Sequence, residues 1–139
     1  MDKAEILAMD TPDLDWLVAT ALFGWVEITD LAEIERLNKT VLTPQKWYLT
    51  PDNERRYYPP TYASNIGKAW VIVERLQELE YWVKIIAGRN GKWEPSATVH
   101  VGKLPDLAGN PSREIAYLSG VGVPEAICKM ALVATLVGK

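Results

Sequence analysis

The stretch Val123-Pro-Glu-Ala-Ile-Cys-Lys-Met-Ala-Leu-Val-Ala-Thr-Leu-Val137 decides the fold of this chain. Pro124 suits the first turn of a helix, and Glu125 suits the positive end of the helix dipole. The residues that follow are apolar nearly all round the helix, and such a helix is buried on more than one side. We therefore expect it to lie between a sheet and another helix, or in an interface between copies of the chain.

Length and composition indicate one domain. The chain has 139 residues, of which 48% are hydrophobic, and this suits a single core. The net charge of −3 argues against binding to duplex nucleic acid, which needs a concentrated positive field. The one cysteine, Cys128, excludes an internal disulfide and a multi-cysteine metal site. No apolar run reaches membrane length and no signal peptide is recognisable, so we expect a cytoplasmic protein with no membrane contact.

Helical periodicity precedes the last helix in three places. Residues 12–23 form the clearest case, with Thr11 as the expected cap. Residues 30–39 carry a thinner apolar stripe, capped by Thr29 or Asp30. Ser64 should cap a third helix that ends near Glu78. On this pattern Ile66 and Trp70 belong to the buried face of the third helix, and Trp16 to the core.

Four segments have the composition of strands: residues 46–50, 81–87, 93–101 and 113–119. The pair Asn90-Gly91 is a strong hairpin signal between the second and third of these. We expect an α+β fold, in which a small, mainly antiparallel sheet is covered by helices on both faces as an α-β-α sandwich.

Three stretches together resemble the phage ABA sandwich domain family, which comprises small proteins of phages and prophages. They are Leu17-Val-Ala-Thr-Ala-Leu-Phe-Gly-Trp25, Pro59-Pro-Thr-Tyr-Ala-Ser-Asn-Ile-Gly-Lys-Ala-Trp70 and Pro124-Glu-Ala-Ile-Cys-Lys-Met-Ala-Leu132. The resemblance implies one sandwich domain over residues 1–139, a phage origin and the cytoplasm of a bacterial host. It implies no common activity. Residues 26–42 look inserted, and Asn65 stands where the family usually has an acid.

No catalytic or metal-binding pattern stands out. His100 could act as a base beside Glu94 or Glu114 in a nucleotide hydrolase, but a lone histidine on a strand is more often structural. One histidine, one cysteine and scattered acids give no metal-ligand spacing. Gly120 and Gly122 precede a helix without completing a phosphate loop. We therefore expect a protein that is not an enzyme and holds no cofactor.

Residues 55–68 are the strongest binding candidate. Arginines suit phosphate groups, tyrosines can stack on a base, and a helix N-terminus favours anions. The candidate residues are Arg55, Arg56, Tyr58, Tyr62, Ser64, Asn65 and Lys68. A purely structural alternative remains, in which Ser64 caps the helix, the tyrosines pack on Pro59 and Pro60, and the arginines pair with Asp52 and Glu54. Secondary candidates are Trp47, Arg89 and Trp93.

Two functions are consistent with these features. The first is a non-enzymatic, phage-derived binding protein, such as an anti-defence sponge that sequesters a nucleotide-derived immune signal of the host. The alternative is a protein-interaction module that inhibits or adapts a host or phage protein. In either case we expect a homo-oligomer that forms contacts through the helix from Pro124 onward.

Overall fold

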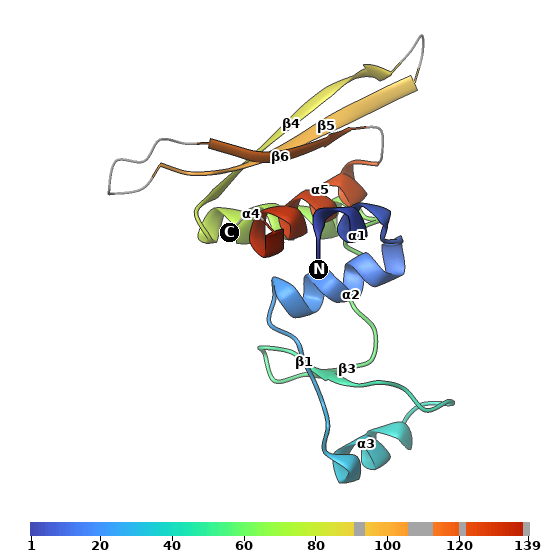
Figure 1. Ribbon diagram of the computed structural model, residues 1–139. Helices are drawn as coiled ribbons and strands as arrows, with labels where there is room; N and C mark the ends of the chain where they lie inside the picture. Colours follow the sequence, from blue (N-terminus) through green and yellow to red (C-terminus); the bar gives the residue numbers. More distant parts are fainter. Residues whose placement is uncertain (91–93, 106–112, 120–121, 138–139) are drawn as a thin grey trace.

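The computed structural model describes residues 1–90, 94–105, 113–119 and 122–137 (Figure 1). The helices are α1 (Lys3–Ala8), α2 (Thr11–Ala21), α3 (Leu31–Asn38), α4 (Ile66–Glu78) and α5 (Val123–Leu132), which continues as a π-helical turn (Val133–Val137). The strands are β1 (Val26–Glu27), β2 (Tyr48–Leu49), β3 (Arg55–Arg56), β4 (Tyr81–Asn90), β5 (Glu94–Lys103) and β6 (Arg113–Ser119). None of the helices in these ranges is long and apolar enough to cross a membrane.

The strands form two antiparallel sheets. The larger one has the order β4-β5-β6, and its register pairs Val83 with Val101 and Ile85 with Val99. The smaller one has the order β1-β2-β3 and is built from two-residue strands. Helices α4 and α5 pack on the larger sheet, and the expected α+β class with an antiparallel sheet is confirmed.

The last helix, α5, lies inside the molecule. One side of it covers β5, where Val99 and Val101 are fully buried, and its other side receives α1 and α2 (Figure 1). All side chains from Ala126 to Leu132 are buried. Of the two positions expected for this helix, the structure shows the one between a sheet and other helices. The chain itself covers residues 126–134, and the expected oligomer contacts through the helix from Pro124 onward stay a prediction.

The order of the layers differs from the expected one. Within the described ranges, α4 and α5 cover one face of the β4-β5-β6 sheet, and no helix lies on the opposite face (Figure 1). Helices α1 and α2 bury their apolar side chains against α5 instead of the sheet. The layers therefore run from the sheet to α4 and α5, and then to α1 and α2. The physical reason is that α5 is apolar all round and needs a cover on both sides.

A buried lysine attaches α1 to α5. Lys129 is 6% exposed, and its ammonium donates a hydrogen bond of 2.7 Å to the carbonyl of Leu7. Glu125, one turn earlier on α5, places a carboxylate oxygen 3.7 Å from the same nitrogen. A buried charge needs such partners. Lys129 thus satisfies a free carbonyl at the end of a six-residue helix and holds it in place.

Two of the expected helix caps are wrong by one residue. The carboxylate of Asp10, not the side chain of Thr11, accepts the first hydrogen bond of α2, from the Asp13 amide at 3.3 Å. The amide oxygen of Asn65, not Ser64, accepts from the Lys68 amide at 3.1 Å. In each pair the capping residue is the one with an extended backbone directly before the helix.

The prediction for the buried face of α4 was partly wrong. Ala69, Val73 and Leu76 are buried as expected, together with Ile72. Trp70 is 51% exposed and Ile66 is 54% exposed. The two lie one turn apart, so they form an apolar stripe on the side of α4 that faces away from the core.

Shortening a side chain in α5 should destabilise the fold strongly. Ile127 is fully buried, so Ile127→Ala should lower the free energy of unfolding by about 2–5 kcal/mol, measured by urea denaturation. Leu136→Ala is the control, because Leu136 is 41% exposed in the π-helical turn and should cost much less. Equal losses for the two variants would contradict the central position of α5.

Candidate functional site

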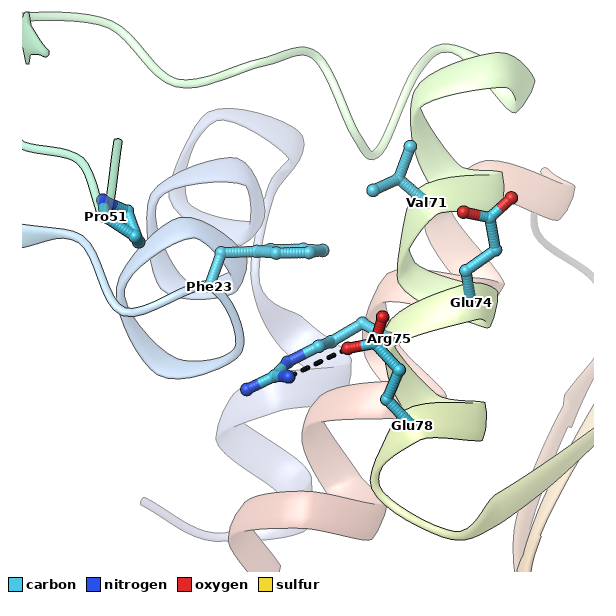
Figure 2. A pocket seen from close by; sticks show the side chains of 6 residues that line it. All are labelled: Phe23, Pro51, Val71, Glu74, Arg75 and Glu78. Carbon is cyan, nitrogen blue, oxygen red and sulfur yellow. Dashed lines mark hydrogen bonds and ion pairs between the residues drawn. The ribbon is translucent and has the colours of Figure 1, made fainter. Parts of the chain in front are cut away.

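A groove runs along α4. Its walls are α4, the end of α2 and the turn of residues 50–54, which we call the 50–54 turn. It consists of three adjoining hollows of about 360, 460 and 260 Å³. The first two share Phe23, Pro51 and Val71, and the last two share Arg56, Pro60 and Lys68. Figure 2 shows the first hollow, with the Phe23 ring directed from the turn after α2 toward α4.

The 50–54 turn is fixed by its own hydrogen bonds. The Asn53 amide donates to the Thr50 carbonyl at 2.9 Å, and the Glu54 amide donates to the Thr50 hydroxyl at 3.1 Å. Pro51 occupies the second position, which its restricted φ favours, and Asn53 adopts a left-handed φ of 66°. The turn therefore presents Pro51 and Asp52 to the groove as a preformed wall.

Aromatic rings line the middle of the groove. Tyr62 is buried and stacks on Phe23, with ring centroids 5.4 Å apart and an angle of 5° between the planes. Trp25 is also buried beside them. Burial raises the pKa of Tyr62 to about 12, so its hydroxyl stays neutral. These rings give the middle hollow an apolar, uncharged surface, and the charged side chains of the same hollow are Asp52, Glu54, Arg56 and Lys68.

A buried carboxylate anchors the segment that carries Tyr62. Asp15 on α2 is 8% exposed and accepts a hydrogen bond of 2.8 Å from the Ala63 amide. Burial raises the pKa of Asp15, and the hydrogen bond from Ala63 only partly opposes this effect. The bond ties the chain before α4 to α2, and so sets the distance between the two sides of the groove. The sequence analysis missed Asp15, because nothing in the α2 pattern marks it as buried.

The end of the groove near the start of α4 is basic. Arg56, Tyr58 and Lys68 line the smallest hollow together with Pro59, Pro60 and Thr61. The guanidinium of Arg56 donates two hydrogen bonds to Glu54, of 3.0 and 2.5 Å, and this carboxylate raises the pKa of Arg56. Tyr58 is 56% exposed. Lys68 forms no ion pair with any residue that the structure describes.

The opposite end of the groove is acidic. Arg75 donates to the Leu22 carbonyl and to the Glu78 carboxylate, each at 3.0 Å (Figure 2). The charge of Glu78 is therefore compensated within α4. Glu74 is exposed and has no ion-pair partner within the described ranges of the chain. The uncompensated charges on α4 are thus Lys68 near one end of the groove and Glu74 near the other.

The structure places several predicted residues away from the groove. Arg55 donates to Glu33 at 2.8 Å and to the Asn53 carbonyl at 3.0 Å, so α3 and the turn hold its side chain. Trp47 is buried and its indole donates to Asn38 at 2.8 Å, so it cannot serve as an exposed contact. Ser64 and Asn65 are exposed at the start of α4 and do not line the hollows.

Two secondary candidates cannot be placed. The side chain of Arg89 and the whole of Trp93 lie outside the described residues. Four predicted residues therefore meet in the groove: Arg56, Tyr58, Tyr62 and Lys68. The sequence analysis missed Phe23, Pro51 and Val71, because their approach depends on how α2 and the 50–54 turn pack beside α4.

The histidine lies on the larger sheet and lines none of the three hollows. The imidazole of His100 is in hydrogen-bond contact with the carboxylate of Glu114, one of its two expected partners, across β5 and β6. Its side chain projects to the face opposite Val99 and Val101, which face the helices. Cys128 is fully buried in α5, and burial raises the pKa of its thiol. Among the described residues, no group of three histidine, cysteine or acidic side chains could hold a metal ion.

No family model matches the chain, and no curated protein or solved structure is significantly similar to it. The resemblance to the phage ABA sandwich domain family therefore stays a prediction.

The anchor at Asp15 gives a pH-dependent prediction. A raised pKa means that the folded state favours the protonated carboxyl. The penalty on folding therefore grows as pH rises above 3.8, the ordinary pKa of aspartate, and is complete once pH exceeds the raised pKa of Asp15. Asp15→Asn removes this penalty and keeps an acceptor for the Ala63 amide. It should raise the free energy of unfolding at pH 7, and the gain should disappear below pH 3.8, the ordinary pKa of aspartate.

Asp15→Ala is the matched variant, because it also removes the acceptor. It should lower stability by about 1–3 kcal/mol near pH 3, the cost of a buried amide without a partner. Urea denaturation at both pH values provides the measurement. A stability gain for Asp15→Asn that is the same at pH 3 and pH 7 would show that burial of the charge is not its cause.

Proposed function

We propose that the protein is a non-enzymatic interaction module, and that its groove takes up part of a partner protein. The observation that carries this proposal is the presence of three exposed apolar side chains on α4, one of them in the groove and two outside its lining. Val71 lines the groove and is 43% exposed, and the exposed stripe of Ile66 and Trp70 lies next to it. Exposed tryptophan beside a preformed groove is typical of the energetic centre of protein interfaces.

The charges around the groove support a protein partner. Its lining holds three basic side chains (Arg56, Lys68 and Arg75) and four acidic ones (Asp52, Glu54, Glu74 and Glu78). Such a balance does not favour a polyanion along the whole groove. An apolar centre with charges of both signs at its rim is the usual composition of a protein interface.

Substitutions of these exposed apolar residues should weaken partner binding. Trp70→Ser or Val71→Asp should weaken the complex by about 2 kcal/mol or more, roughly thirtyfold, as expected for an interface centre. The measurement is a pull-down from bacterial lysate, followed by titration of the retained partner. Leu31→Ser on α3 is the control, because Leu31 is 81% exposed and distant in sequence from the groove. A stoichiometric partner retained equally by all variants would contradict the proposal.

A nucleotide-like ligand is the second candidate, favoured by the smallest hollow. Arg56, Lys68 and Tyr58 line it, and no acidic residue does. Two cations beside an exposed tyrosine ring suit a phosphate and a base. This arrangement supports sequestration of a nucleotide-derived immune signal in a bacterial host, as expected for an anti-defence protein of phage origin.

Calorimetry with cyclic dinucleotides and ADP-ribose tests the second candidate. If one of them binds, Lys68→Ala should weaken it roughly tenfold, because a charged hydrogen bond is lost. Lys39→Ala is the control, since Lys39 is exposed at the end of α3. The absence of binding of all these ligands to the folded protein would remove this candidate.

A further inference from the structure

We infer that the segment held in the groove is a short extended peptide with an acidic and a basic residue at least three positions apart and apolar residues between them. This inference rests on the proposed function, because it takes the groove as the binding surface for a partner protein. It is carried by the order of charges along α4 and by the shape of the groove.

The two ends of the groove offer charges of opposite sign. Arg56 is neutralised by Glu54, and Glu78 by Arg75. Lys68 and Glu74 have no ion-pair partner in the described part of the chain, so each can pair with a charge on a ligand. An acidic residue of the ligand suits Lys68, and a basic residue suits Glu74.

The spacing of these charges sets the spacing in the ligand. Lys68 and Glu74 are six residues apart on α4, which corresponds to about 9 Å along a helix. The two side chains also lie about 120° apart around the helix, so their charges are farther apart than this axial rise. An extended chain covers about 3.3 Å per residue, so its two charged residues should be at least three positions apart. Val71 lies midway and faces Phe23 and Pro51, so the residues between the charges should be apolar.

The wall of the groove favours an extended chain recognised by its side chains. The lining consists of aromatic rings, prolines and the side of a helix, and none of the described residues that form it belongs to the edge of the larger sheet. Arg56 belongs to β3, an edge strand of the smaller sheet, but this strand has only two residues and offers little edge for the addition of another strand. Three hollows in a row suit successive side chains of one extended segment, in the way that grooves of aromatic residues bind proline-rich peptides.

Asp52 modifies the charge preference. It lines the middle hollow from the 50–54 turn and forms no ion pair within the described ranges. The groove therefore carries more uncompensated negative than positive charge. The groove should therefore bind a peptide with two basic residues more tightly than a peptide with two acidic residues.

A displayed library of random seven-residue peptides tests the inference without knowledge of the partner. The whole protein is used as bait in four forms: wild type, Lys68→Glu, Glu74→Lys and the control Lys39→Glu. All three positions are exposed, so the fold should be preserved, and circular dichroism checks this. Fluorescence anisotropy then measures the affinity of the selected peptides for each form.

The charge pattern of the enriched peptides should change with the charges at positions 68 and 74 of the form used as bait. Wild type and Lys39→Glu should enrich peptides with one acidic and one basic residue at least three positions apart. Lys68→Glu should enrich peptides with two basic residues, and Glu74→Lys those with two acidic residues. Each matched charge should tighten binding by about two- to fivefold, the range of an exposed ion pair.

Two results would overturn the inference. One is the same charge pattern for all four forms, and the other is the absence of enrichment by the folded protein. Val71→Asp separates this failure from that of the proposed function. Suppose that all four forms enrich peptides with the same charge pattern. If Val71→Asp abolishes binding of these peptides, the groove is the binding surface but the inferred pairing with Lys68 and Glu74 is wrong. If it leaves their binding unchanged, both proposals fail.

Discussion

The structure depends on burying one helix from all sides. Residues 126–134 comprise most of α5 and the first two residues of the π-helical turn. They are apolar except for Lys129, and all nine are buried. A sheet can cover only one side of such a helix. Helices α1 and α2 therefore complete the enclosure on the other side, and the hydrogen bond from Lys129 to Leu7 holds the shorter of the two in place.

The groove is a consequence of this enclosure. Because α2 packs on α5, its end and Phe23 come to lie beside α4 (Figure 2). The bond between Asp15 and Ala63 then fixes the chain that leads into α4, and the stacking of Tyr62 on Phe23 closes the floor. The core thus determines the width of the groove, while exposed residues on α4 determine its charges.

The sequence predicted the individual helices and strands more accurately than it predicted how they pack together. The strand at residues 113–119 and the helix over residues 30–39 were predicted closely, because their alternation and capping are local. The exposure of Trp70 and the burial of Trp47 were not predicted, because aromatic residues suit both environments. Arg56, Tyr58, Tyr62 and Lys68 were found because they are close in sequence. Phe23 and Asp15 were missed because only tertiary packing brings them close to α4 and the segment before it.

Amide hydrogen exchange of α5 tests the central claim most directly. If a single chain encloses this helix, the amides of residues 127–134 should exchange slowest among the described residues, since they open only with the whole fold. Their rates should not change when the protein is diluted. Rapid exchange in α5, or protection that is lost on dilution, would show that a second copy of the chain is needed to bury it.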